Sequence, residues 1–359
     1  MIIQSIELNN FRNYENLQIS FDEGTNILFG DNAQGKTNIL EAAYLSGTTK
    51  SHKGSKDKEM IRFGTNEAHL RTMVLKNGKQ YQIDMHLKHN RSKGIAVNKI
   101  PMKKASELFG ILNIVFFSPE DLNIIKNGPS ERRHFLDAEL CQLDKIYLSD
   151  LSNYNKILNQ RNKLLKDMVY RPELSDTLPV WDMQLIDTGK KIIRRREQFV
   201  KELNELVHEI HYRISGGREE LFLSYEPSVS ADLLEQELER VKPRDLKQCQ
   251  TSVGPHRDDL LFSIAGVDIR KFGSQGQQRS AALALKLAQL EYVRQEIDEF
   301  PVLLLDDVMS ELDDQRRCQL LKFIDGKVQT FITVNDKALI PDLSGNAYFR
   351  IIEGRIAEG

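Results

Sequence analysis

The sequence has few cysteines, no long apolar run and no signal-peptide pattern in its first residues. Its three cysteines, Cys141, Cys249 and Cys318, lie too far apart for a metal-ligand motif or a disulfide framework. No apolar run approaches the roughly 20 residues that a membrane-spanning helix needs. The first residues also lack the basic and then apolar design of a signal peptide. We therefore expect a cytoplasmic protein in a reducing environment, with no membrane partner.

An excess of basic charge is also missing. The formal net charge is −2, so the molecule is not a uniformly basic coat for nucleic acid, and any polyanion must meet a local patch. With 40% hydrophobic and 28% charged residues, the composition is that of a soluble globular protein. A length of 359 residues is too great for one ordinary core, which predicts two domains or lobes.

The two ends of the chain read as strands and helices in alternation. Apolar residues alternate over the first twenty residues, which predicts an antiparallel pair of strands. Residues 67–100 also read as strands, with a strong hairpin-turn signal at Asn77-Gly78 and a weaker one at Lys93-Gly94. A strand over 113–117 runs into a turn at Pro119, and the C-terminal part reads helix, strand, helix, strand and a closing strand pair.

The middle of the chain has a helical period instead. It extends from about residue 130 to 215, with a proline-containing break at 170–179, and a further helical piece ends before Pro243. We therefore expect an α/β fold of mixed sheets with flanking helices, interrupted by a helical second lobe. The expected parts are an N-terminal half at 1–122, a helical insertion at 123–250 and a C-terminal half at 251–359.

One motif indicates a phosphate site. The segment from Gly30 to Thr37 has the pattern G-x-x-x-x-G-K-T, and it follows a predicted strand and opens a predicted helix, as this motif requires. The loop would direct backbone N–H groups at phosphate oxygens, Lys36 would neutralise the outer phosphates, and the Thr37 hydroxyl would ligate Mg²⁺. The predicted nucleotide-binding residues here are Gly30, Asp31, Asn32, Ala33, Gln34, Gly35, Lys36, Thr37 and Asn38.

A second motif would complete the metal site. Residues 302–305 are all apolar, which is typical of a strand buried on both faces of a parallel sheet, and Asp306 and Asp307 follow at its carboxyl end. Asp306 would hold Mg²⁺, and Asp307 would orient or activate the attacking water. The simpler alternative is an acidic turn after a strand.

The segment SQGQQRS, which begins at Ser274, has two interpretations. Ser274 and Gln277 fit the pattern S-x-x-Q, a capping box that satisfies backbone donors at a helix start. The same polar helix mouth could also hold a phosphate.

Together these motifs resemble the RecF family of bacterial recombination mediators, which is related to the ABC-type ATPase heads of SMC proteins. The resemblance rests on FGDNAQGKTNILEAAYL, FFSPEDLNIIKNGPSERRHFLDAEL, SVGPHRDDL, SQGQQRSAALALKLAQ and LLLDDVMSELD, which are spread over most of the chain. It implies an ABC-type P-loop ATPase head interrupted by a helical lobe. It also implies ATP and Mg²⁺ as ligands and a DNA-bound role in repair, replication and the SOS response, at gaps or single-strand/double-strand junctions, with RecO and RecR.

The resemblance further implies that Ser274, Gly276 and Gln277 form the signature motif, which contacts the γ-phosphate of ATP held by a second copy. An ATP-dependent homodimer with two composite sites follows, with residues 310–313 linking the sites. The sequence departs from the pattern in three places: Asp307 replaces a glutamate, the segment from Thr333 to Asn335 falls where many relatives carry a histidine, and the usual glutamine near Ser118 is missing. These departures predict slow hydrolysis.

Two basic stretches are candidate DNA contacts. One is near the predicted 67–100 hairpins and the other is in a predicted helix of the insertion. The candidates are Lys88, Arg91, Lys93, Lys103, Lys104, Arg194 and Arg195. Such clusters suit sequence-independent phosphate contacts, although a solvated face is the simpler interpretation. No interleaved aromatic residues indicate base stacking on single strands.

Three other functions remain open at this stage. A transporter's nucleotide-binding subunit would share the motifs but lacks so large a helical insertion. A long SMC-type coiled coil needs hundreds of residues of heptads. A scaffold that binds ATP without hydrolysing it is compatible with Asp307. The segment from Gly254 to Asp259 has no assigned chemistry, and a turn packed under the nucleotide fold is the simpler interpretation.

Overall fold

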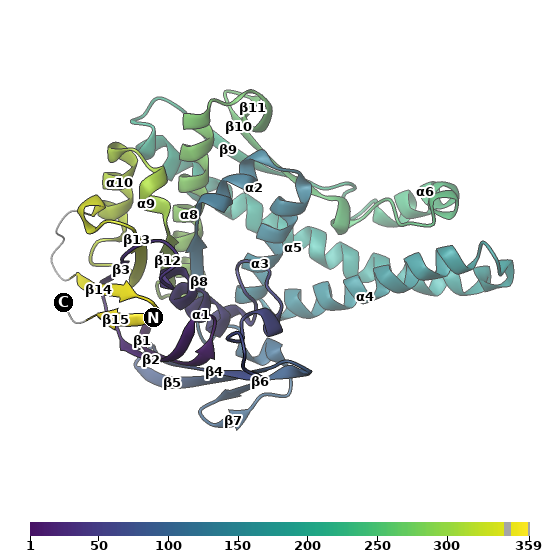
Figure 1. Ribbon diagram of the computed structural model, residues 1–359. Helices are drawn as coiled ribbons and strands as arrows, with labels where there is room; N and C mark the ends of the chain where they lie inside the picture. The colour runs from purple at the N-terminus through teal and green to yellow at the C-terminus, as the bar shows by residue number, and fades with distance from the viewer. Residues whose placement is uncertain (341–345, 358–359) are drawn as a thin grey trace. The chain divides into compact units, whose positions relative to one another are not determined.

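The computed structural model describes residues 1–340 and 346–357 (Figure 1). The chain divides into two compact units, one formed by Met1–Asp121 with Leu285–Gly359 and the other by Leu122–Ala284. The second unit begins beside the expected start of the helical insertion, but it extends beyond residue 250. Strand pairing explains the extension, because residues 259–264 pair with residues 221–226 of the same unit.

The first unit contains an antiparallel sheet with the order β2-β1-β4-β5-β6-β7 in the described residues. Its strands are β1 (Ile2–Phe11), β2 (Tyr14–Ser20), β4 (Glu67–Lys76), β5 (Lys79–Lys88), β6 (Arg91–Val97) and β7 (Ile100–Pro101). The N-terminal strand pair and the Asn77-Gly78 turn are confirmed, since both turn residues have positive φ, 47° and 71°. The turn expected at Lys93-Gly94 is wrong: both residues lie within β6, where Gly94 pairs with His86 of β5, and the chain turns at His89 and Asn90 instead.

A second sheet of this unit has the order β15-β14-β3-β13-β12-β8 in the described residues. Its strands are β3 (Thr25–Phe29), β8 (Ile114–Phe117), β12 (Val302–Asp306), β13 (Thr330–Val334), β14 (Ala347–Ile352) and β15 (Arg355–Ala357). Every neighbouring pair is parallel except β14 with β15. Because parallel strands end at one edge, the carboxyl ends of β3, β12 and β13 lie side by side.

The helix α1 (Lys36–Thr48) contacts strands of both sheets of the first unit (Figure 1). It is buried on most sides, which suits its small and aliphatic residues, among them Ala42, Ala43 and Leu45. Phe21 packs edge-to-face on Phe331 with ring centroids 4.6 Å apart, inside one extended apolar cluster. The shorter elements of this unit are η1 (Asp57–Glu59), η2 (Ala105–Leu108), η3 (Pro119–Asp121), α9 (Val308–Glu311), α10 (Asp314–Ile324) and η6 (Lys337–Leu339).

The second unit is mainly helical. Its elements are α2 (Leu122–Lys126), α3 (Pro129–Leu143), α4 (Lys145–Asp167), η4 (Pro172–Thr177), α5 (Leu178–Ile214), β9 (Leu221–Glu226), α6 (Leu234–Gln248), η5 (Pro255–Arg257), β10 (Asp259–Ile264), β11 (Val267–Asp268) and α7 (Ile269–Phe272), and α8 (Gln275–Ile297) begins in it. The long helices α4 and α5 lie side by side (Figure 1), joined at the predicted proline-containing break.

The helix α6 does not end before Pro243 as expected but continues to Gln248. Its last turn contains the buried carboxylate of Asp245, which forms an ion pair with Arg161 at 2.8 Å. This tertiary contact holds the helix beyond the proline, which would otherwise favour an end there. Throughout the described residues, no helix is both long enough and apolar enough to span a membrane.

Candidate nucleotide-binding site

The loop between β3 and α1 has the backbone that the motif predicts. Gly30 and Gly35 have φ values of 139° and 115°, which residues with a Cβ rarely adopt. A Cβ at Gly30 would lie 2.5 Å from the backbone oxygen of Ile351, and one at Gly35 would lie 2.7 Å from the Tyr14 hydroxyl. Both glycines are therefore required by backbone conformation and by close packing.

The rest of the loop is supported by residues that sequence reasoning missed. The Asn13 side chain donates to the Gln34 carbonyl at 3.0 Å and accepts from the Asn38 side chain at 2.8 Å. The Tyr14 hydroxyl donates to the Gly35 carbonyl at 3.0 Å. The loop tip itself, Asp31, Asn32 and Ala33, is exposed. The only sequence signal for these residues was their position between the first two predicted strands, where a polar turn needs no link to the phosphate-binding motif.

Lys36 lies at the first position of α1 and is buried. Its ammonium donates to the carbonyl oxygens of Gly30 and Asp31, the latter at 2.8 Å, and to the Asn335 side-chain oxygen at 3.0 Å. Burial lowers the pKa of Lys36, and the nearby carboxylate of Asp307 opposes that shift. The ammonium is therefore held over the loop by neutral acceptors, which a phosphate could replace.

The structure brings together Thr37 and Asp306, the two residues expected to hold Mg²⁺. The Thr37 hydroxyl donates to an Asp306 carboxylate oxygen at 2.8 Å, and the Thr333 hydroxyl donates to the same oxygen at 2.7 Å. Asp306 ends β12 and Thr333 lies in β13, so the parallel register brings them together. A hydroxyl and a carboxylate at this separation are the oxygen ligands that Mg²⁺ prefers.

Asp307 follows immediately, in a left-handed conformation with φ 54°. Its backbone N–H donates to the Thr333 hydroxyl at 2.9 Å, and its exposed side chain accepts from Ser310 at 3.2 Å. Thr333 thus fixes the peptide between the two aspartates. The side chain of Asp307 is left facing solvent, where a water molecule can reach it.

A partly buried ion pair joins α1 to the turn after β1. The Arg12 guanidinium forms two hydrogen bonds with Glu41, at 2.7 and 2.6 Å, and Ser51 donates to the same carboxylate at 2.5 Å. Burial alone would raise the pKa of Glu41, but the hydrogen bonds from Arg12 and Ser51 hold it below its ordinary value. This pair also escaped sequence reasoning, since Arg12 and Glu41 are far apart in the chain.

The signature-like residues lie at the start of α8, in the second unit. The predicted capping box is confirmed: the Ser274 N–H donates to the Gln277 side chain at 2.8 Å, and the Gln277 N–H donates to the Ser274 hydroxyl at 3.2 Å. The Gln277 amide also donates to Glu219 at 2.9 Å. Gly276 lies between the two capping residues.

Comparison with known proteins assigns the family. A family model described as the RecF/RecN/SMC N terminal domain matches residues 2–351. A protein of Agathobacter rectalis named "DNA replication and repair protein RecF" is 64% identical over 358 residues, which cover 99% of each chain. The chain belongs to the RecF family. A protein of the same name from Lachnoclostridium phytofermentans is 54% identical over the whole of both chains.

Solved structures agree with the RecF assignment. A RecF structure described as the ATP form of the recombination mediator in the RecFOR pathway is 39% identical and superposes with a TM-score of 0.92, covering 99% of this chain and 96% of its own. An Smc head domain from Pyrococcus furiosus, 18% identical, covers 99% of this chain and 94% of its own at a TM-score of 0.58 and shares the fold. The predicted ABC-type ATPase head is therefore confirmed.

The segment from Gly254 to Asp259, part of the RecF resemblance, forms contacts within the second unit. Asp258 is buried and accepts hydrogen bonds from Tyr225, from the Ser228 N–H at 2.8 Å and from Arg196 at 3.4 Å. His256 bonds the Tyr154 hydroxyl through Nδ1 at 2.7 Å and the Thr251 carbonyl through Nε2 at 3.0 Å. The segment therefore joins helices and strands of this unit.

The candidate DNA-binding residues of this RecF chain differ in their availability. Lys93 donates to the Thr49 carbonyl at 2.5 Å and to Asp57 at 2.7 Å, and Arg195 pairs with Asp144 at 3.1 Å. The other five candidates form only exposed or long ion pairs, or none. Arg194 pairs at 2.8 Å on an exposed surface and Lys88 lies 4.0 Å from Glu67, while Arg91, Lys103 and Lys104 are exposed and have no ion-pair partner in the part of the chain described.

Proposed function

We propose that this chain is a DNA repair and replication ATPase that binds Mg-ATP, dimerises when ATP is bound, and hydrolyses the ATP slowly. The proposal rests on one geometry: the Thr37 hydroxyl lies 2.8 Å from the Asp306 carboxylate, beside the buried ammonium of Lys36. The RecF relatives, named as DNA replication and repair proteins, supply the biological setting.

The loop and Lys36 bind the triphosphate. Backbone N–H groups of the loop and the start of α1 face the phosphates, and the Lys36 ammonium exchanges its contacts with loop carbonyls for contacts with phosphate oxygens. Asn335, which already touches Lys36 at 3.0 Å, is then near the outer phosphate. It therefore takes the place where many ABC-type ATPases carry a histidine.

Thr37 and Asp306 would hold Mg²⁺ through their oxygen atoms. When bound, the ion supplies neutralising charge between the two outer phosphates. Thr333 keeps Asp306 in place by donating to it at 2.7 Å. The residues present therefore fit the ion.

Asp307 would orient the attacking water. Its side chain is one methylene shorter than glutamate, so we expect a water held there to be poorly aligned and turnover to be slow. Asp307→Asn should lower the hydrolysis rate by at least about 100-fold and leave ATP binding nearly unchanged. A phosphate-release assay with a nucleotide-binding assay checks both. If the variant hydrolyses ATP at the wild-type rate, another group orients the water. If the wild type itself hydrolyses no ATP, the protein is a scaffold that binds ATP without cleaving it.

A second copy would complete each site through Ser274, Gly276 and Gln277. The decisive experiment is molar mass by light scattering, with and without Mg-ATP, for the wild type, Ser274→Arg and Lys36→Ala. We expect the wild type to dimerise with ATP, Ser274→Arg to bind ATP as a monomer, and Lys36→Ala not to bind ATP. If Ser274→Arg dimerises like the wild type, the segment is only a helix cap and the dimer mechanism fails.

DNA would be bound through phosphate contacts. Arg91, Lys103 and Lys104 are the most available of the candidates, so replacing all three with alanine should weaken binding at every sequence and reduce the salt slope by up to about three. Arg194→Ala with Arg195→Ala is the matched control from the second unit. We propose gapped or junction DNA as the substrate and RecO and RecR as partners, since the solved relatives belong to the RecFOR pathway.

A further inference from the structure

The antiparallel sheet of the first unit has a cluster of metal-ligand side chains on its outward face. Glu67 and His69 lie on β4, and His86 lies opposite on β5, since the register pairs His69 with His86. Strand residues two apart share a face, so all three side chains project the same way. One ligand atom from each residue lies within 4.8 Å of the others.

The donor atoms are close to the geometry that a metal requires. His86 Nε2 lies 2.9 Å from a Glu67 carboxylate oxygen, and the two imidazole rings stack with centroids 3.8 Å apart. Ligands of a tetrahedral zinc ion lie roughly 3.4 Å apart, given bonds of about 2.0–2.2 Å. Small changes of side-chain torsion therefore bring two nitrogens and one oxygen around one ion.

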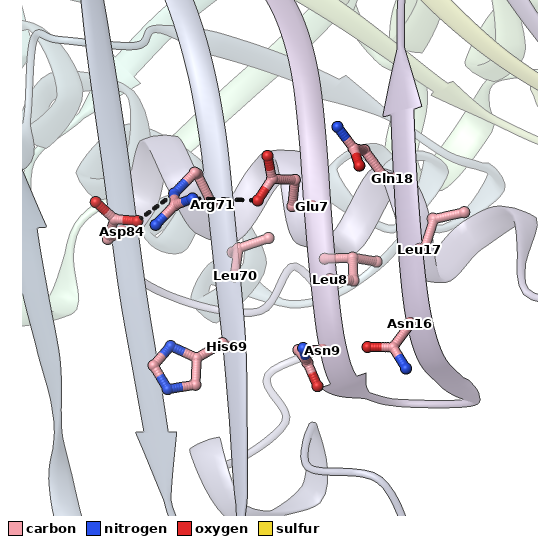
Figure 2. A pocket seen from close by; sticks show the side chains of 10 residues that line it. All are labelled: Glu7, Leu8, Asn9, Asn16, Leu17, Gln18, His69, Leu70, Arg71 and Asp84. Atoms are coloured by element: carbon pink, nitrogen blue, oxygen red, sulfur yellow. Dashed lines mark hydrogen bonds and ion pairs between the residues drawn. The ribbon is translucent and has the colours of Figure 1, made fainter.

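The surroundings leave this position accessible. Figure 2 shows His69 at one end of a polar pocket of about 450 Å³, and Arg71 at the other end, held by ion pairs to Glu7 and Asp84. The Lys88 ammonium lies 4.0 Å from Glu67, and its side chain is partly exposed. The residue beside His86 on β6 is Gly94, which has no side chain to cover the ring.

We propose that Glu67, His69 and His86 bind a divalent transition-metal ion, with zinc as the best match, on the outward face of this sheet. Two imidazoles and one carboxylate are a common zinc ligand set with an open fourth position for water. The ion would join β4 to β5, and its open position would suit a ligand atom from a partner.

The test uses the full-length chain without nucleotide. Zinc is titrated against a chromophoric chelator for the wild type, for His69→Gln with His86→Gln, and for the control His89→Gln, an exposed histidine in the adjacent turn. We expect one equivalent of zinc bound by the wild type and by the control. The double variant should lose at least about tenfold in affinity. Thermal unfolding in EDTA verifies that all the chains fold alike.

Two further variants test the ligand set itself. Glu67→Gln should weaken zinc binding while leaving the histidine pair intact, and Lys88→Met should strengthen it by removing the cation that competes for Glu67. Cobalt bound in place of zinc should give the intense visible absorption of a four-coordinate site in the wild type and in the His89→Gln control, and not in the double histidine variant. The proposal is overturned if the wild type binds no zinc at micromolar concentration, or if the double histidine variant binds it as tightly as the wild type does.

Discussion

The interiors of the two units are stabilised in different ways. The first unit is built around one extended apolar cluster that includes Phe331 and Leu304. In the second unit, three arginines are almost completely buried, Arg132, Arg161 and Arg196, with 1%, 0% and 2% exposure. Each forms an ion pair with at least one aspartate. An apolar core tolerates changes of shape, whereas a buried ion network specifies one arrangement, because each charge requires its partner.

The largest expected effect tests this comparison directly. Arg196 donates to Asp137 at 2.7 Å, to the Tyr147 hydroxyl at 2.9 Å and to the Pro255 carbonyl at 2.7 Å. Arg196→Ala removes these hydrogen bonds and the positive charge that faces the fully buried Asp258, so it should lower the free energy of unfolding by about 3–5 kcal/mol. Urea unfolding followed by fluorescence measures it, since the single tryptophan, Trp181, lies in α5 of the same unit.

A matched control lies two residues earlier on the same helix. Arg194 pairs with Asp232, but both side chains are well exposed, at 65% and 83%. Arg194→Ala should therefore cost less than about 1 kcal/mol. Equal costs for the two variants would show that the buried network does not stabilise the second unit more than an exposed ion pair does.

The same two arginines show where sequence reasoning stops. Arg194, Arg195 and Arg196 are consecutive in the sequence, and only the helical period separates Arg194 from Arg196: residues two apart on an α-helix are about 200° apart, so one faces solvent and the other the interior. The partners of Arg196 could not be predicted, because Asp137 lies 59 positions away and no local pattern links them. The ion pair of Arg195 with Asp144 could not be predicted either, because these residues are also far apart in the sequence.

The nucleotide site was predictable because its signals are local. The loop from Gly30 to Thr37 carries its own turn and helix start, and Asp306 was located by a buried strand that ends beside it. A parallel sheet then brings these ends together by rule. The residues that escaped, Asn13 and Tyr14, act from a different sheet, and only the folded chain brings them to the loop.

Acid should weaken both units by a shared cause. Burial lowers the pKa of His52 in the first unit and of His256 in the second to about 4, from an ordinary value near 6.5. As the pH falls, these histidines bind protons in the unfolded chain before they do so in the folded chain. Their contribution to the free energy of unfolding is therefore complete well above pH 6.5 and declines as the pH falls from 6.5 to about 4. Each histidine should account for about 3 kcal/mol. Urea unfolding at several pH values measures the loss, and a curve that is flat between pH 6.5 and 4 would contradict it.

Substitution by phenylalanine separates the two histidines at pH 7.5. Both ring nitrogens of His52 are buried, have no hydrogen-bond partner among the described residues, and lie in a ring stacked on Phe116 at 4.1 Å. His52→Phe should therefore leave stability unchanged or raise it by about 1 kcal/mol, since a phenyl ring stacks alike and buries no polar atom. His256→Phe should cost about 1–3 kcal/mol, because the Tyr154 hydroxyl and the Thr251 carbonyl each lose a partner. Circular dichroism reports both units and Trp181 fluorescence reports the second, so the two losses are separable. If His52→Phe costs more stability than His256→Phe, the buried imidazole of His52 makes a polar contribution to the first unit that this prediction denies.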